Sequence, residues 1–164
     1  MKKIGSIEGA AIYHGKDDDG REIIQFTAKA AICTDGMPKN IYGDKHWQRK
    51  TAYQNGGKWL NADKVPYVVV PPFIISAVDG VILGSEAAAV NLRNGNESDA
   101  ITGEVGPKDK IGEVSIELAR RLGINPHPNH GGTNEKIVRY TIFVGEPAVV
   151  DGIRYRLQPA TRRR

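Results

Sequence analysis

The amino-acid sequence predicts a mainly β fold: a small closed or partly closed β-barrel, double-psi-like, with one principal α-helix. Several short segments alternate apolar and polar residues, as half-buried strands do, whereas only one segment has helical periodicity. A sheet of many short strands removes its exposed edges by closing, so a barrel is the expected architecture. The 164 residues fit one domain, 1–164, because no linker or internal repeat divides them. Its last residues, 160–164, are expected to form a disordered basic tail.

The first predicted strand runs from Ile24 to Ile32, where the even positions are apolar and the odd positions mostly polar. Before it, Asp17-Asp18-Asp19-Gly20 is typical of a hairpin turn. The three aspartates also suggest calcium, but no bidentate acid follows at the position that an EF-hand loop requires. The only cysteine, Cys33, excludes an intramolecular disulfide and is expected to be a buried structural thiol.

The middle of the chain predicts a buried strand and then a hairpin. Residues 66–71 are an apolar, β-branched run with a proline at each end, which is typical of a strand covered on both faces. Ala88, Val90 and Leu92 alternate toward Asn94-Gly95, a strong two-residue hairpin signal. The chain then returns through residues 100–103, which places Glu104 at a strand end.

The principal helix is predicted over about residues 110–122. Its apolar face is formed by five residues at helical spacing: Ile111, Val114, Leu118, Ala119 and Leu122. Asp109 is the expected N-cap and Gly123 follows the end. Glu113 would lie in the first turn, on the side that faces away from the core.

The C-terminal part predicts two more strands. Val138, Tyr140, Ile142 and Val144 alternate with polar or smaller residues. Asp151-Gly152 then turns the chain into a last strand over residues 153–157.

Charge and hydropathy limit the classes of partner. The net charge of +4 and pI of 9.2 suggest nucleic acid, but residues 162–164 alone supply three of those charges and no aromatic-plus-basic strand motif is present. We therefore predict no nucleic-acid partner. The longest apolar stretch, 65–78, is interrupted by prolines and is shorter than the ~20 residues of a membrane helix. The basic start lacks a following apolar stretch, so we expect the chain to be cytoplasmic or released by a non-classical route. We also expect it to be a monomer.

The densest chemical signal is the glycine-punctuated segment 103–115, which contains Glu104 and Glu113. Two carboxylates on separate elements can face one another across a groove, as hydrolysis of a glycosidic bond requires: one protonates the leaving oxygen and the other activates water. The alternative is structural, because a glutamate in a first helical turn commonly serves solvation and the helix dipole.

Several segments resemble those of the fungal-type chitosanases, glycoside hydrolase family seventy-five. Residues 106–115, Gly-Pro-Lys-Asp-Lys-Ile-Gly-Glu-Val-Ser, followed by Leu-Ala at 118–119 and Leu-Gly-Ile-Asn-Pro at 122–126, are similar to the family signature. Upstream, the run ending in Thr-Asp-Gly at 34–36, then Asp44, Thr51 and residues 60–71, resemble earlier blocks in the same order. The resemblance covers roughly residues 24 to 145.

This resemblance implies a catalytic domain that cleaves β-1,4 linkages inside chitosan or a related amino-sugar polymer with inversion. The pair would be Glu104 and Glu113, with Glu113 as general acid and Glu104 as general base. Inversion needs room for a water between carboxyl groups about 6.5–9.5 Å apart. The first acid of the family is usually aspartate, so Glu104 is longer by one methylene. No cofactor is implied, because two carboxylates and water suffice.

Five further residues are candidates for binding the polymer. Asp35 and Asp44 lie in the matching blocks and would bind amino groups or orient the base, although aspartates beside glycine are commonly turn residues. Tyr42 and Trp47 would stack on sugar rings, with core packing as the alternative, and Lys108 lies in the signature segment. His127 and His130 have no evident third ligand, so no metal site is predicted.

The acids of the region also bear on the substrate. Six acids between residues 97 and 117 oppose only Lys108 and Lys110 there, which predicts an acidic site that attracts a protonated polyamine. The acids are Glu97, Asp99, Glu104, Asp109, Glu113 and Glu117. Two alternatives stay open: a glycan-binding module of the same fold without catalysis, and a hydrolase of peptidoglycan.

Overall fold

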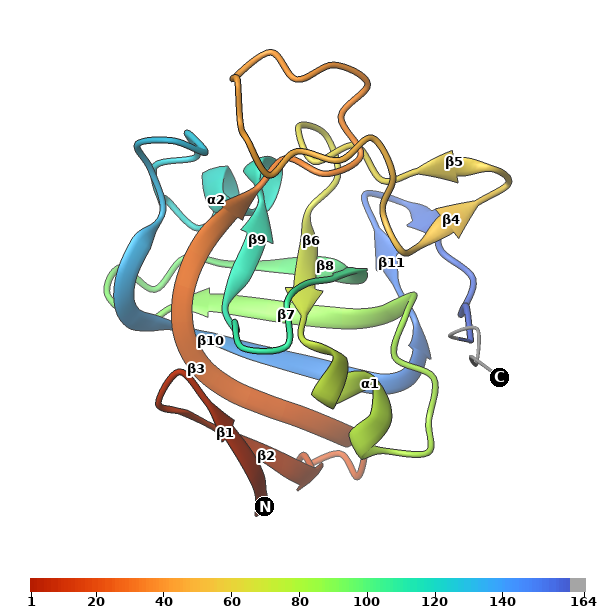
Figure 1. Cartoon of the computed structure of the whole chain (residues 1–164). Helices are drawn as coiled ribbons and strands as arrows, with labels where there is room; N and C mark the ends of the chain where they lie inside the picture. The colour runs from red at the N-terminus through yellow and green to blue at the C-terminus, as the bar shows by residue number, and fades with distance from the viewer. Residues whose placement is uncertain (160–164) are drawn as a thin grey trace.

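The computed structural model describes residues 1–159, which fold into a β-barrel with two short helices (Figure 1). The predicted basic tail, 160–164, lies outside the described residues. The elements in chain order are β1 Lys2–Ile7, β2 Ala10–Lys16, β3 Glu22–Cys33, β4 Gln54–Asn55, β5 Lys58–Trp59, β6 Tyr67–Val70, α1 Pro72–Ala77, β7 Ser85–Asn91, β8 Glu97–Val105, β9 Glu113–Ser115, α2 Ile116–Arg121, β10 Thr133–Pro147, β11 Val149–Val150 and β12 Ile153–Arg154.

Six strands close the barrel in the order β3, β10, β7, β8, β6, β9, and β9 pairs with β3 again. The β3–β9 and β6–β8 pairs are parallel, while the other pairs within the ring are antiparallel. The predicted mainly β barrel is thus confirmed. The closed ring leaves β3, β6, β8 and β9 without free edges where they meet, which is the advantage of closure for short strands.

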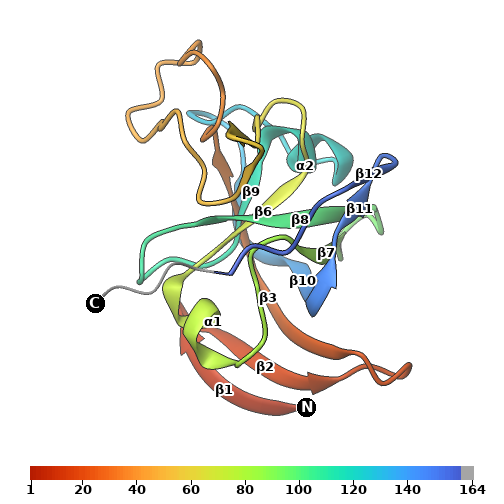
Figure 2. The ribbon, with the colours of Figure 1, turned by 90° about the vertical axis from the view of Figure 1, so that its right-hand side faces the viewer.

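Two strands, β2 and β9, pair in succession with the same edge of the long strand β3. Its first half pairs with β2, where Ile12 faces Phe26, and its end pairs with β9, where Ala31 faces Glu113. The β1–β2 hairpin therefore extends from the barrel along the first half of β3, as Figures 1 and 2 show at the N-terminal side.

Most predicted strands and turns are confirmed. The even positions from Ile24 to Ala30 are buried, all four residues of β6 are buried, and the alternating positions from Val138 to Val144 face the core. The turn at residues 17–20 joins β2 to β3, and Asn94-Gly95 lies in the connection between β7 and β8. These segments have a single apolar face, so their sequences determine which side is buried.

The buried face of β7 is the opposite of the apolar series 88, 90 and 92. Ala87 and Ala89 are fully buried, whereas Leu92 is 49% exposed. Three consecutive alanines give the strand no preferred side, so the facing strands decide its register. At the C-terminus, the predicted last strand is only Ile153–Arg154, which pairs with β11 across the Asp151-Gly152 turn.

The prediction of one helix over residues 110–122 is wrong in its first half. Residues 113–115 form β9, and α2 covers only Ile116–Arg121. Val114 pairs with Val68 on one side and Ile32 on the other, so closure of the barrel outweighs the helical pattern. Ser115, and not the predicted Asp109, is the N-cap of α2, and its Oγ accepts the N–H of Leu118 at 3.2 Å.

A second short helix, α1, begins directly at Pro72, where the fixed φ of proline suits the first helical position. Within residues 1–159, neither helix combines the length and the apolar content needed to cross a membrane.

Candidate active site

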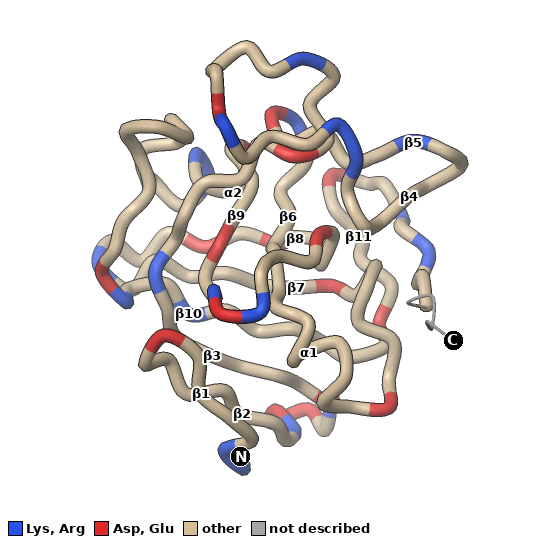
Figure 3. Tube along the Cα trace, in the orientation of Figure 1, with Lys and Arg blue, Asp and Glu red and all other residues tan. Residues whose placement is uncertain are grey.

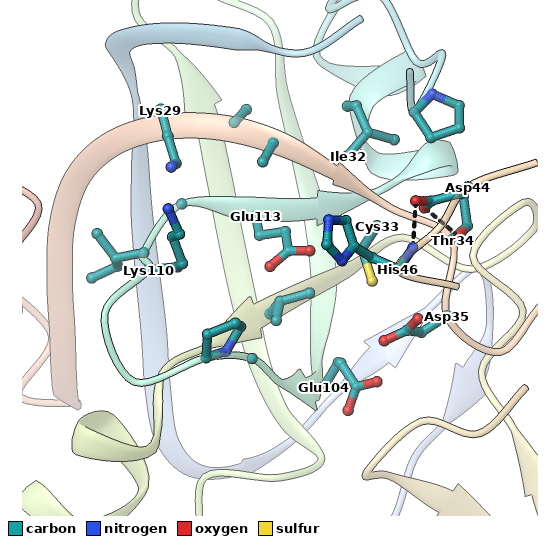
Figure 4. Close-up of a pocket in the computed structure, with 18 of the residues that line it drawn as sticks. Lys29, Ile32, Cys33, Thr34, Asp35, Asp44, His46, Glu104, Lys110 and Glu113 are labelled. Carbon is teal, nitrogen blue, oxygen red and sulfur yellow. Dashed lines mark hydrogen bonds between the residues drawn. The ribbon is translucent and has the colours of Figure 1, made fainter. Parts of the chain in front are cut away.

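A cavity of about 580 Å³ opens beside the ends of β3 and β8 and the start of β9. Both predicted catalytic glutamates line it, as do Asp35 and Asp44 from the loop that follows β3. Figure 4 shows the carboxyl groups of Glu104, Glu113 and Asp35 pointing into the same space. Four carboxyl groups, two from the loop after β3, one from β8 and one from β9, therefore lie in one pocket.

The register of the barrel fixes how far apart the two glutamates lie. Val69 of β6 pairs with Glu104 on one side and with Glu113 on the other. Residues in register on neighbouring strands share a face, and two strand spacings separate their backbones by about 10 Å. The two glutamates thus lie on the strands to either side of Val69, and both line the cavity.

An irregularity in β8 aims Glu104 at the cavity. Val68 pairs with Thr102 and Val69 with Glu104, so Gly103 is the extra residue of a β-bulge. A side chain at Gly103 would collide with Leu60, which explains why glycine occupies this position. A glycine inside a strand often marks a bulge, so Gly103 is the sequence signal for the bulge in β8.

Two backbone donors hold the carboxylate of Glu104. Its Oε1 accepts the N–H of Ala52 at 2.8 Å and the N–H of Val105 at 2.9 Å. Burial raises the pKa of Glu104 to about 8, and a side-chain hydrogen bond with Asp35 and the charge of Asp35 act in the same direction, while the two backbone N–H groups lower it. Glu104 and Asp35 thus form a carboxyl–carboxylate pair.

Glu113 is also raised in pKa, although for a different combination of reasons. Burial raises the pKa of Glu113 to about 7, assisted by the charges of Asp35 and Asp44, while a hydrogen bond with the Cys33 thiol and the charge of Lys29 oppose the rise. The structural alternative of a helix-dipole role does not apply to Glu113, because this residue lies in β9 and not in a helix.

Asp35 and Asp44 are placed at the pocket by turn contacts. Asp35 Oδ1 accepts the N–H of Gln48 at 2.9 Å, and Asp44 Oδ2 accepts the Thr34 hydroxyl at 2.8 Å. Asp44 is 8% exposed and is also bonded to the N–H of His46. Both aspartates are therefore turn residues and lining residues at once.

The other three binding candidates lie outside the cavity lining. Trp47 donates its indole N–H to the carbonyl of Met37 at 3.0 Å, and Tyr42 packs edge-on against His127. Both rings are half-buried against other parts of the loops. Lys108 is exposed in the turn between β8 and β9, where its neighbour two residues on, Lys110, lines the cavity instead.

Lining residues that the sequence did not single out change the charge of the site. Lys29, Lys110 and His46 bring basic groups, and the buried Cys33 lines the floor. Of the six acids between residues 97 and 117, only Glu104 and Glu113 line the cavity. Figure 3 shows red and blue segments side by side in the turn between β8 and β9. The lining thus carries four carboxyl groups against two lysines, and two of the four, Asp35 and Asp44, come from the loop after β3 rather than from residues 97–117.

The His127–His130 pair is explained by local structure. The two rings stack with centroids 4.6 Å apart, and His127 Nδ1 accepts the N–H of Asn129 at 3.1 Å. Among residues 1–159, no group of three or more His, Cys, Asp or Glu side chains is arranged to hold a metal ion.

The two glutamates provide the groups that general acid–base catalysis on a neutral or cationic molecule requires. One carboxyl with a pKa near neutrality can donate a proton, and another, fixed by backbone donors, can accept one. Both line the same cavity of about 580 Å³. Such pairs with pKa values raised by their surroundings are typical of enzyme sites.

Two comparisons with known proteins match this chain. The model of the family described as fungal chitosanase of glycosyl hydrolase group 75 matches residues 27–160. Endo-chitosanase C of Aspergillus oryzae is 30% identical over 131 residues, which cover 76% of this chain and 32% of that protein. The chain thus spans about a third of the length of this relative.

Proposed function

The chain belongs to the fungal chitosanase family of glycosyl hydrolase group 75, and on that premise we propose that it hydrolyses β-1,4 linkages within chitosan or a related amino-sugar polymer. Glu104 and Glu113 are the proposed catalytic pair. The observation that carries the proposal is their common register partner, Val69, which sets them on either side of one cavity. The relative named as an endo-chitosanase supports the substrate.

We propose inversion by direct attack of water as the stereochemical course, because the family resemblance of the sequence implies it. An inverting enzyme holds its carboxyl groups about 6.5–9.5 Å apart, which leaves room for that water, whereas a retaining one holds them about 5–5.5 Å apart.

Glu113 is proposed as the general acid. Its pKa, raised to about 7 by burial first, keeps it protonated at mildly acidic pH. A protonated carboxyl can give its proton to the leaving glycosidic oxygen as the bond breaks. A carboxyl group with an ordinary pKa would be ionised under the same conditions and unable to do so. Glu104, with a pKa of about 8, differs from Glu113 in the two backbone N–H groups that hold its carboxylate.

Glu104 is proposed as the general base that takes a proton from the attacking water. The N–H groups of Ala52 and Val105 orient its carboxylate and favour the ionised form. Without substrate, burial first and the neighbouring Asp35 second raise the pKa of Glu104 to about 8. A substrate ammonium group beside Asp35 would offset the charge of that aspartate and lower the pKa of Glu104, which favours the base form when a cationic sugar is bound.

The test is release of reducing ends from soluble chitosan at pH 5.5–6 by the wild type, Glu113→Gln and Glu104→Gln. Loss of about 10²-fold or more in both variants is expected, as is usual when an acid or base is removed. Glu97→Gln, an exposed glutamate at the other end of β8, is the matched control. Hydrolysis that survives Glu113→Gln would contradict the proposal.

Peptidoglycan and cellulose serve as parallel substrates in the same assay. Turnover of peptidoglycan alone would replace the proposed polymer while keeping the pair. Tight chitosan binding with no product in a long digestion would indicate a glycan-binding module instead.

A further inference from the structure

The tip of the β1–β2 hairpin has a backbone conformation that its residue does not favour. Glu8 and Gly9 form the two-residue turn between Ile7 and Ala10, with φ of 50° and 75°. A turn with both φ values positive prefers asparagine, aspartate or glycine at its first position. A glutamate there indicates that its side chain has a use that outweighs the backbone strain.

That side chain reaches the wall of the candidate active site. Glu8 Oε2 accepts a hydrogen bond from the ammonium group of Lys29 at 2.9 Å, and Oε1 accepts one from the N–H of Ile111 at 2.9 Å. Lys110 Nζ lies 3.9 Å from Oε2. The carboxylate is 29% exposed and Lys29 22%. One side chain thus connects β3 with the segment that joins Glu104 to Glu113.

The segment 106–112 is attached to the barrel at its start, where the N–H of Gly106 donates to the carbonyl of Val70 at 2.9 Å. At its end, Gly112 has φ of +83° and its carbonyl accepts the N–H of Ala31 at 2.9 Å. A side chain at Gly112 would collide with the carbonyl of Lys29, so the segment lies directly on β3 there. Glu113 follows at once. The hydrogen bond from Ile111 to Glu8 is thus a further attachment of this segment, two residues before Glu113.

Glu8 also governs the charge next to Glu113. Lys29 is a cation whose charge lowers the pKa of Glu113, and Glu8 neutralises part of it. The groups that act on Glu113 from the surrounding elements are Lys29, Cys33, Asp35 and Asp44. Those that face Glu8 are Lys29, Lys110 and, across a side cavity of about 220 Å³, Lys136.

The side cavity borders the candidate site. It shares Lys29, Ile111 and Asn134 with the main cavity, and Glu8 and Ala10 form its wall on the hairpin side. The hairpin precedes residue 27, where the family match begins. Residues of this chain outside the matched region thus border the site.

We propose that Glu8 is a positioning residue: it holds Lys29 and the backbone of Ile111, and thereby fixes the place and the charge environment of Glu113. Glu8 itself does not contact the reacting atoms. The inference rests on the proposed function for its kinetic consequences, but the position of Glu113 and its titration can be measured without turnover.

Two substitutions separate the contacts. Glu8→Gly removes both and suits the positive φ, so the hairpin should fold and the melting temperature should change little. Glu8→Gln can still accept the N–H of Ile111 but cannot neutralise Lys29. The matched control is Asp151→Gly, because Asp151 also has a positive φ, 53°, and an ion pair with Arg121 at 2.7 Å, in a turn that does not line either cavity.

The kinetic readout is kcat and KM on soluble chitosan. Glu8→Gly is expected to lower kcat about tenfold with a smaller change in KM, because misplacement of a catalytic group acts on the chemical step. Asp151→Gly should stay within about twofold of the wild type, as surface changes away from a site do. Unchanged kcat in Glu8→Gly, or an equal loss in Asp151→Gly, would overturn the inference.

The second readout is the NMR titration of the Glu113 carboxyl carbon. In Glu8→Gln the uncompensated charge of Lys29 favours the carboxylate, so the titration midpoint should fall below that of the wild type. An unchanged midpoint would refute the electrostatic part, whatever the activity. If the wild type does not cleave chitosan, the proposed function fails while this titration still decides the role of Glu8. If Glu8→Gly does not fold, Glu8→Gln carries both readouts.

Discussion

Glu113→Gln should stabilise the protein at alkaline pH while removing its proposed activity. The pKa of Glu113 is raised, by burial first, from 4.5 to about 7 in the folded state. The folded protein therefore retains a proton that the unfolded chain releases above pH 4.5. Stability due to this group is complete below that pH and is lost as the pH rises through about 7.

The magnitude follows from the two pKa values. At about 1.4 kcal/mol per pH unit, the loss between pH 4.5 and 7 amounts to about 3 kcal/mol. Glutamine resembles the protonated form and does not ionise. The free energies of unfolding of the wild type and Glu113→Gln should therefore be similar at pH 4.5 and should differ by up to about 3 kcal/mol at pH 8, with the variant more stable.

Urea unfolding followed by tryptophan fluorescence at pH 4.5, 6 and 8 measures this difference. The slope with urea should be the same for both proteins, so that a change in midpoint reports stability. Glu97→Gln controls for replacing a glutamate on an exposed surface. A difference between wild type and Glu113→Gln that stays constant with pH would refute the reasoning, because a raised pKa requires it to vary.

Three other outcomes are expected. Hydrolysis should decline as the pH rises through about 7, because the general acid Glu113 loses its proton there; a rate that still rises at pH 8 would contradict its role. Asp35→Asn should lower the pKa of Glu104, since it removes the neighbouring charge that raises it, and carboxyl NMR titration measures this. Gly36→Ala should cost about 2 kcal/mol or more, because φ is +85° and a side chain there would overlap a backbone carbonyl; Gly57→Ala, also at positive φ but with open space around it, should cost less in the same urea assay.

The helical pattern in residues 110–122 illustrates how local periodicity misleads. Apolar residues at 111, 114 and 118 suit one face of a helix, yet Ile111 and Val114 are buried in coil and strand before the helix begins. The barrel needs β9 to close against β3, and this pairing between distant segments has no local signature. Glu113 consequently belongs to a strand, where burial rather than a helix dipole sets its pKa.

Several site contacts likewise depend on residues far apart in the sequence. The bond from Ala52 to Glu104 and the one from Ile111 to Glu8 join segments separated by 52 and 103 residues. No spacing rule relates such pairs. Lys29 was predictable as a polar position on a strand, but its contact with Glu8 depends on the β1–β2 hairpin lying along β3.

The sequence by itself determined the β-rich class, the strands with a clear apolar face, the tight turns and, through the motifs of the family resemblance, the choice of Glu104 and Glu113. These features arise from alternation, turn chemistry and short motifs, which act within a few residues. Tertiary structure alone decided the register that sets Glu104 and Glu113 about Val69, the carboxyl pair with Asp35 and the basic groups beside them. Those depend on which strands meet when the barrel closes, and closure is a property of the whole chain.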